Sequence, residues 1–348
     1  MNLYLTSPGK LSRRENTLRF RKFELPEEYA TSDEVCPLPE DEATVSTHNL
    51  PVETIDAVYL FGETRLNTKL LTFLAQKNVP VHIFNYWGHH TGSFMPHAEQ
   101  LSGDLVIAQG QAFRDPEQRL DLCKAIVDAK IHNMLSVLAY YRRRHKDIED
   151  TENRIRELRK QAAATDSPDT LMGFEGMSTR SYYAVWKHWL TDAPDKFTRV
   201  YHPPDNPLNA MISFLNSMLY TACVSELHRT ALYPGISYMH APQSRRFSLA
   251  LDLVEPFKPL MVDRLLFRLF NQGDIGKSDF QPHSNGVLLK DEARKRVLQA
   301  WDEQLKTTVA HPTLNRSVSY RQLIRLDCYK LTKHLLEGTD FQPYRIAY

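Results

Sequence analysis

The spacing of hydrophobic positions changes along the chain and divides it into two parts. In the first hundred residues, short apolar runs are separated by glycine and proline, a pattern typical of β-strands. One helical interval, residues 67–76, has leucines at three- and four-residue spacing before Asn78 and Pro80 end it. We therefore expect a β-rich N-terminal region with strands at residues 2–6, 17–20, 57–61 and 79–84.

After Pro96, the hydrophobic positions take the three- and four-residue spacing of helices. A long helix is expected at residues 116–144. Another begins at Asn206-Pro207, where asparagine can cap and proline suits the first helical position. Further helices are expected at residues 171–190, 259–270, 291–306 and 320–336. The predicted fold class is α+β, with a small β-rich domain at residues 1–97 and a larger all-α domain at residues 98–348.

Composition is that of a globular protein. For 348 residues two domains are a better expectation than one, and 42% hydrophobic residues suffice for packed cores. No N-terminal signal sequence and no uninterrupted apolar stretch of about 18 residues is present, so we expect neither secretion nor a membrane span. The four cysteines are far apart and form no CxxC pair, which favours a cytoplasmic protein.

Charge is distributed unevenly, although the formal net charge is only +1. Residues 24–56 contain ten Asp and Glu and no Lys or Arg, so the remaining chain has 43 Lys and Arg against 32 Asp and Glu. A basic body suits a polyanionic partner such as nucleic acid. Ordinary variation of surface charge explains these counts equally well, so charge alone does not identify the partner.

A carboxylate interrupts the apolar face of the helix expected at residues 171–190. Glu175 lies on a stripe with Thr179 and Tyr182 at three- and four-residue steps. A buried carboxylate is unfavourable unless it is paired, protonated or bound to a metal ion. The alternative, which the pattern alone favours, is a residue at the edge of the stripe that pairs with Arg180 or with a neighbouring helix.

A second group of candidates lies within residues 240–258, HAPQSRRFSLALDLVEPFK. Asp252 and Glu255 are three residues apart, so one helical turn places both side chains on the same side. His240 lies upstream, in a loop that can fold back over the two acids. One imidazole with two or three carboxylates is a donor set for Mg²⁺ or Mn²⁺. On spacing alone, a surface loop followed by a charged helix start is the better interpretation.

Basic side chains flank these acids, and the motifs of several other protein classes are absent. Arg245, Arg246 and Lys258 are placed to bind a phosphate backbone that enters such a site. The sequence has no GxSxG, GxGxxG, GxxxxGK[ST] or HExxH motif, so α/β-hydrolase, dinucleotide-binding, P-loop and zincin sites have no support. The basic run at residues 142–146 is typical of a solvated helix end.

Six segments together resemble the family of the universal CRISPR adaptation integrase, the protein numbered one among the CRISPR-associated proteins. The resemblance extends over nearly the whole chain. Its segments are residues 5–11 (LTSPGKL), 57–68 (AVYLFGETRLNT), 84–96 (FNYWGHHTGSFMP), 173–182 (GFEGMSTRSY), 205–220 (DNPLNAMISFLNSMLY) and 247–263 (FSLALDLVEPFKPLMVD). The last three are specific only in combination. Two departures are the acidic stretch at residues 33–42 and a slightly long loop between the histidine and the acids.

The resemblance implies residue roles. It implies a catalytic site of four side chains, namely Glu175, His240, Asp252 and Glu255. Glu175, His240 and Glu255 would bind Mg²⁺ or Mn²⁺, while Asp252 would orient His240 or a metal-bound water unless it merely caps the following helix. DNA contacts are expected from the helix that carries Asn209 and Tyr220 and from the basic residues Lys258, Arg245 and Arg246.

The implied activity is DNA integration by phosphoryl transfer during spacer acquisition, in which the 3′-hydroxyl of a captured DNA end attacks a phosphodiester at the border of a CRISPR repeat. The resemblance also implies a homodimer formed through the N-terminal domain and a small ferredoxin-like partner protein. Two alternatives stay open. One is a stand-alone metal-dependent nuclease acting on branched DNA or RNA, and the other is a non-catalytic DNA-binding scaffold.

Overall fold

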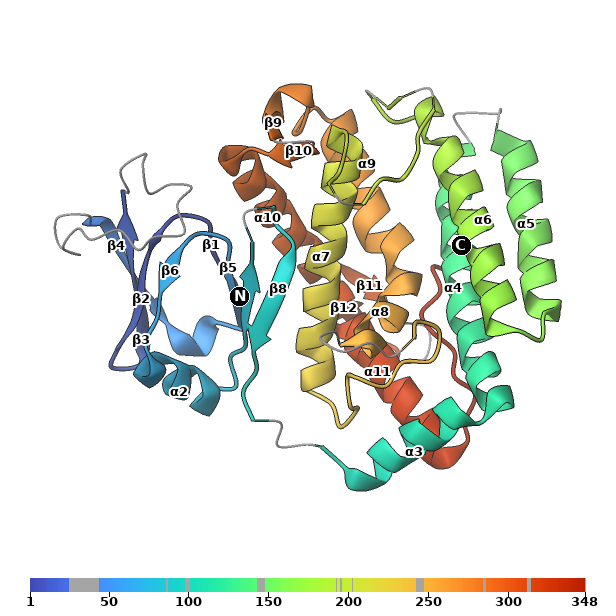
Figure 1. Ribbon diagram of the computed structural model, residues 1–348, viewed down its shortest axis with the longest axis horizontal. Coiled ribbons are helices and arrows are strands. Elements are labelled where there is room, and N and C mark those ends of the chain that lie inside the picture. Colours follow the sequence, from blue (N-terminus) through green and yellow to red (C-terminus); the bar gives the residue numbers. More distant parts are fainter. Residues whose placement is uncertain are drawn as a thin grey trace. The chain divides into compact units, whose positions relative to one another are not determined.

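The chain folds into two compact units, Met1–Glu99 and Gln100–Tyr348. The computed structural model describes residues 1–24, 44–85, 87–97, 101–142, 148–191, 193–194, 196–201, 203–241, 247–283, 286–311 and 314–347. The first unit is rich in strands and the second is helical, which confirms the predicted α+β fold class (Figure 1). Among the described residues, no helix combines the length and hydropathy needed to cross a membrane.

The first unit contains two four-stranded sheets. One sheet has the order β1-β5-β7-β8, with parallel pairing of β1, β5 and β7 and an antiparallel edge strand β8. Its strands are Asn2–Leu5, Ala57–Leu60, Val81–Phe84 and His90–Phe94. The other sheet has the order β4-β3-β2-β6. Its strands are Thr44–Pro51, Thr17–Phe23, Gly9–Arg14 and Thr64–Arg65.

The apolar strands of this unit were predicted and the polar ones were not. All four expected strands are present as β1, β3, β5 and β7. Helix α2, Thr68–Gln76, begins where Asn67 accepts a hydrogen bond from the Leu70 N–H, at 2.9 Å. Buried leucines such as Leu11, Leu18 and Leu70 form the core between the elements. Strands β2 and β4 escaped prediction because they are largely polar and depend on pairing with β3.

The second unit is built from nine helices within its described residues. They are α3 (Gly103–Arg114), α4 (Pro116–Arg142), α5 (Glu149–Ala164), α6 (Pro168–Ala184), α7 (Pro207–His228), α8 (Ser248–Val254), α9 (Arg264–Asn271), α10 (Asp291–Lys306) and α11 (Tyr320–Glu337). Helices α4, α5 and α6 lie side by side, and α7 is buried over most of its length (Figure 1). The unit also contains two hairpins that periodicity did not predict. Their strands are Phe280–His283 with Gly286–Leu289 and Thr308–Ala310 with Ser317–Ser319.

The start of α7 was predicted from its capping residue. Asn206 accepts a hydrogen bond from the Asn209 N–H at 2.9 Å, and Pro207 occupies the first turn of α7, as predicted. Helix α6 is shorter than the predicted 171–190 interval. It ends at Ala184 and is followed by the 3₁₀ turn Trp186–His188.

The chain changes helical pitch three times between α8 and α9. Helix α8 continues into a 3₁₀ turn at Glu255–Phe257, then a π-helix at Lys258–Asp263, and then α9. Pro256 and Pro259 have no N–H to donate, so regular α-helical bonding is interrupted at both positions. Short π-helical segments often occur at functional sites. This segment carries Glu255 and Lys258.

Candidate functional site

A cavity of about 590 Å³ brings together residues from distant parts of the helical unit. Its lining includes Glu175 from α6, His240 from the loop after α7, and Glu255 and Lys258 from the segment after α8. Three of the four predicted catalytic residues therefore face one cavity. The fourth, Asp252, is completely buried behind His240.

Asp252 holds the loop that carries His240. Its carboxylate accepts hydrogen bonds from three successive backbone N–H groups, those of Tyr238 (2.6 Å), Met239 (3.0 Å) and His240 (3.0 Å). The same carboxylate lies 2.7 Å from Nδ1 of the His240 ring. An ionised carboxylate accepts only, so Nδ1 carries the hydrogen and Nε2 faces the cavity side of the ring, 4.0 Å from Oε1 of Glu255. Asp252 lies inside α8 rather than capping a helix that follows it.

Glu175 is paired with a neighbouring helix and also faces the cavity. Its Oε1 atom accepts hydrogen bonds from Nζ of Lys130 on α4 and from the Thr179 hydroxyl, the latter at 2.8 Å. Pairing with a neighbouring helix is the alternative that the sequence pattern favoured. The side chain is 20% exposed, so it is reachable from the cavity.

Glu255 is bonded to two ammonium groups. Its Oε2 lies 2.6 Å from Nζ of Lys130, and its Oε1 lies 2.5 Å from Nζ of Lys258. Burial alone would raise the pKa of Glu255, but the charges of Lys130, Lys258 and His240 together hold this pKa far below its ordinary value. Glu255 is therefore an ionised carboxylate in the folded protein.

Lys130 is the most important site residue that sequence reasoning missed. It is about 95% buried and lies on the apolar stripe of α4, between Val127 and Met134 at three- and four-residue spacing. A lysine at a core-facing position of a long helix is a signal of an internal ion pair. Its partners, Glu175 and Glu255, lie 45 and 125 residues away, so no local pattern identifies them.

Asp263 is a second missed acid of the cavity. It closes the π-helix and is 4% exposed. Burial raises the pKa of Asp263 to about 7, although the positive charges of Lys130 and Lys258 act in the opposite direction. The carboxyl group is therefore partly protonated near neutral pH.

Asn133 ties the turn after Glu255 to the C-terminal segment. Its side-chain NH₂ donates to the carbonyl oxygens of Pro256, at 2.7 Å, and Tyr344, at 3.1 Å. Its side-chain oxygen accepts from the Ile346 N–H at 2.8 Å. Asn133 is fully buried on the same helix as Lys130. Helix α4 therefore fixes the turn that carries Glu255 through one amide and one ammonium group.

The predicted DNA-contacting residues of α7 do not line the cavity. Asn209 is fully buried, and its amide donates to the Thr198 carbonyl at 2.9 Å and accepts from Arg199 at 3.1 Å. The Tyr220 hydroxyl accepts a hydrogen bond from the Phe247 N–H at 3.1 Å. Their contact with DNA stays a prediction. The same holds for Arg245 and Arg246, which lie outside the described residues, as does the acidic stretch at residues 33–42.

The donor set suits Mg²⁺ or Mn²⁺, although lysines now contact its acids. Nε2 of His240 and Oε1 of Glu255 are 4.0 Å apart. Adjacent ligands of an octahedral ion at roughly 2.1 Å are about 3.0 Å apart, so the two side chains would have to move closer together to share one ion. Among the described residues, no group of three or more His, Cys, Asp and Glu side chains is arranged to hold a metal ion. The residue types fit the ion, but Glu175 can bind it together with His240 and Glu255 only if the contact between Glu175 and Lys130 changes.

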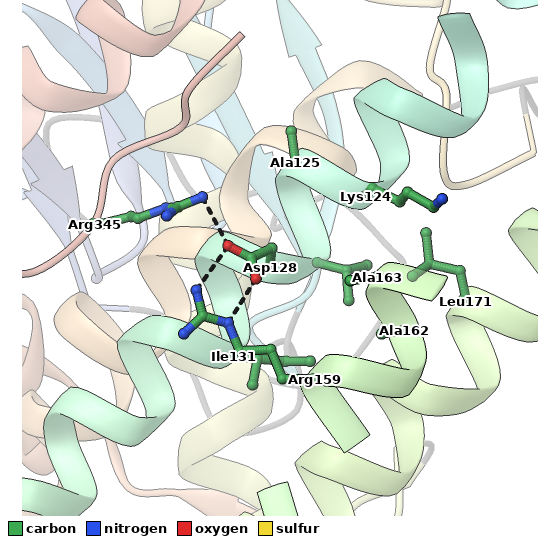
Figure 2. A pocket seen from close by; sticks show the side chains of 10 residues that line it. Lys124, Ala125, Asp128, Ile131, Arg159, Ala162, Ala163, Leu171 and Arg345 are labelled. Atoms are coloured by element: carbon green, nitrogen blue, oxygen red, sulfur yellow. Dashed lines mark hydrogen bonds and ion pairs between the residues drawn. The ribbon is translucent and has the colours of Figure 1, made fainter. Parts of the chain in front are cut away.

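A second, smaller cavity of about 250 Å³ lies among α4, α5 and α6 (Figure 2). Asp128 at its wall forms bonds of 2.6 and 2.9 Å with Arg159 and of 2.7 Å with Arg345. Burial opposes ionisation, yet the two guanidinium groups hold the pKa of Asp128 below its ordinary value. The carboxylate is neutralised within the protein, and the remaining lining is mostly apolar.

Comparison with known proteins covers the whole site. The model of the family CRISPR associated protein Cas1 matches residues 3–303. A protein of Haloferax volcanii named CRISPR-associated endonuclease Cas1 is 40% identical over 344 residues, with 99% of this chain and 97% of that protein covered. A protein of the same name from Fusobacterium nucleatum is 35% identical, with 99% and 96% covered.

A solved structure supports the same assignment. The structure of a CAS1 protein from Thermotoga maritima superposes with a TM-score of 0.83 at 32% identity and covers 98% of both chains. The range matched by the family model includes Glu175, His240, Asp252 and Glu255. The family resemblance seen in the sequence is thereby confirmed, and this chain belongs to the CRISPR-associated Cas1 family.

Proposed function

We propose that this chain is a metal-dependent DNA integrase and endonuclease of CRISPR adaptation. It would join the 3′-hydroxyl ends of captured DNA into the repeat of a CRISPR array. Membership of the Cas1 family supports the proposal, and so do relatives named as endonucleases that are similar over nearly their full length. The observation that carries it is the convergence of Glu175, His240 and Glu255 on one cavity that also contains Lys258.

The cavity combines groups that bind a divalent cation with groups that bind phosphate. Glu175, Glu255 and Nε2 of His240 would hold Mg²⁺ or Mn²⁺, which when bound would polarise the scissile phosphate and stabilise the leaving oxygen. Asp252 fixes the ring of His240 through Nδ1, so Nε2 keeps one direction. Lys258 and Arg199 line the same cavity and would bind phosphate oxygens.

The proposed reaction is a one-step exchange of phosphodiester bonds. The 3′-hydroxyl oxygen of the captured end forms a bond to the repeat phosphorus as the bond to the leaving 3′-oxygen breaks. The proton of the attacking hydroxyl is given up and the leaving oxygen gains one, so no net proton is consumed. Water in place of the hydroxyl gives hydrolysis, which would account for endonuclease activity at the same site. The chain needs no covalent intermediate.

The proposed assembly is a cytoplasmic homodimer that binds double-stranded DNA with a small ferredoxin-like partner. The β-rich first unit would supply the dimer contact, because a domain of about 100 residues is only modestly stable alone. Its sheets present edge strands β1, β4, β6 and β8 among the described residues. The basic excess outside residues 24–56 supports a polyanionic ligand.

A joining assay tests the proposal. The purified chain, its partner, Mg²⁺, a repeat-bearing plasmid and labelled DNA with 3′-hydroxyl ends are expected to give label covalently attached at the repeat border. The same DNA with dideoxy 3′ ends should give none. Cleavage of branched DNA or RNA without any joining would favour the stand-alone nuclease, and neither activity would favour the DNA-binding scaffold.

A further inference from the structure

Lys130 occupies the centre of the acid cluster. Its Nζ atom contacts Oε1 of Glu175, from α6, and Oε2 of Glu255, from the turn after α8. The side chain is 6% exposed and belongs to α4, which packs against both elements. One ammonium group therefore links the two acids to which a divalent ion would bind.

The electrostatics of this position make the link strong in the absence of a metal ion. Burial alone would lower the pKa of Lys130, but the charges of Glu175 and Glu255 and their hydrogen bonds raise this pKa above its ordinary value. The lysine is therefore a permanent cation inside the site. Without it, Glu175 would lose its charged partner and Glu255 would keep only Lys258.

The same position makes Lys130 a competitor of a divalent ion. A carboxylate oxygen that accepts a hydrogen bond from an ammonium group has less capacity for a metal ion, and the two positive charges repel each other at short range. The contact with Glu175 is the one that must open. Thr179 bonds the same oxygen of Glu175 at 2.8 Å and can keep that side chain in place.

The cavity also offers the ammonium group another acceptor. Asp263 lines the same cavity and is close enough for the charge of Lys130 to influence its carboxyl group. Rotation of the lysine side chain toward Asp263 would give its ammonium group a carboxylate partner in place of Glu175. The ion could then take the place between Glu175 and Glu255 without leaving the lysine unpaired.

We propose that Lys130 is a positioning residue that acts as an internal counter-cation, holding Glu175 and Glu255 together in the metal-free protein and releasing Glu175 when a divalent ion binds. This inference rests on the proposed metal site. It assigns a function to a residue outside the metal ligands, and it explains why no three-ligand cluster is assembled among the described residues.

Calorimetric titration of the full chain with Mn²⁺ tests the inference. Lys130→Met removes the charge with little change in side-chain length, and Lys124→Met makes the same change on the same helix at the second cavity. We expect Lys130→Met to bind Mn²⁺ roughly tenfold tighter or more, because a competing positive charge is gone. Lys124→Met should match the wild type. Unchanged or weaker binding by folded Lys130→Met would overturn the inference.

Thermal unfolding separates this function from a purely structural ion pair. Lys130→Met should melt below the wild type in EDTA, and saturating Mn²⁺ should close that gap, because tighter binding stabilises the folded state more. A deficit that Mn²⁺ leaves unchanged would mean that Lys130 acts only as a structural residue.

A crystal structure of the wild-type chain with Mn²⁺ gives a test that does not depend on the folding of a variant. The expected result is Mn²⁺ in the cavity with Nζ of Lys130 beyond hydrogen-bond distance of Glu175. Bound Mn²⁺ together with an intact contact between Lys130 and Glu175 would overturn this inference but not the proposed metal site. Absence of Mn²⁺ from the site, together with no calorimetric binding by the wild type, would overturn the proposed metal site itself.

Discussion

Asp252 contacts His240 twice, through the ring Nδ1 at 2.7 Å and through the backbone N–H at 3.0 Å. The carboxylate thereby fixes both the position of the residue and the direction of its ring. Because Asp252 has no exposed surface, these contacts replace water entirely. The two acids of the DxxE pair therefore have different environments, since Glu255 faces the cavity and Asp252 does not.

We expect Asp252→Asn to slow strand transfer more than it weakens metal binding. The amide nitrogen of asparagine cannot accept the hydrogen bonds that the carboxylate accepts, so the His240 ring loses its fixed direction. Loss of such an orienting partner reduces metal affinity or activity by about 10–100-fold. Rates and Mn²⁺ affinities of Asp252→Asn and Glu255→Gln should be compared. Loss of metal binding in Asp252→Asn, with binding retained in Glu255→Gln, would reverse our assignment.

Glu175→Ala should abolish strand transfer with either Mg²⁺ or Mn²⁺ while the protein stays folded. The variant removes a proposed metal ligand and leaves Lys130 with Glu255 as its partner. Glu157→Ala is a matched control, because Glu157 is an exposed acid on α5, with its side chain 58% exposed. Circular dichroism and sedimentation should show both variants folded alike. Transfer activity in Glu175→Ala with Mn²⁺ would remove Glu175 from the site.

Asp263 should make the free energy of unfolding depend on pH. Burial raises the pKa of Asp263 to about 7 from its ordinary value of 3.8, so the folded state keeps a proton that the unfolded state has already lost. This contribution to stability is complete below about pH 4 and is lost as pH rises toward 7. Urea unfolding of Asp263→Asn and wild type should be compared across this range. The free energy of unfolding of the variant should rise relative to that of the wild type by up to about 1.4 kcal/mol per pH unit as pH increases. A difference that is independent of pH would contradict the prediction.

Lys258 should contribute to DNA binding through phosphate charge. In the DNA-free protein, Nζ of Lys258 lies 2.5 Å from Oε1 of Glu255. When DNA binds, this ammonium group can leave Glu255 and bind a phosphate oxygen instead. Each neutralised phosphate contributes about −0.9 to the slope of log affinity against log salt concentration. Lys258→Gln should therefore flatten the slope by about this amount. Lys160 is an exposed lysine of α5, and Lys160→Gln should leave the slope unchanged. Equal slopes for the wild type and both variants would exclude Lys258 from the interface.

Signals within a few residues predicted the apolar strands and several long helices but missed α3, α5 and both hairpins of the second unit. The pair Asn206-Pro207 located the start of α7. The three-residue step from Asp252 to Glu255 predicted two acids on one side, but spacing alone favoured a surface loop, and only the family resemblance joined both acids with His240. Lys130 could be noticed on the apolar stripe of α4, but its partners depend on packing of three separate elements. The role of Asp252 in the 238–240 loop likewise depends on folding across 12 to 14 residues.

The most direct test of the account is strand transfer measured against the concentration of Mn²⁺. Wild-type protein stripped with EDTA should be inactive, and activity should return with the same half-saturation as Mn²⁺ binding measured by calorimetry. Glu255→Gln should neither bind Mn²⁺ in the cavity nor regain activity. Joining of 3′-hydroxyl ends by stripped wild-type protein, or full activity of Glu255→Gln at low Mn²⁺, would contradict a metal site built on Glu175, His240 and Glu255.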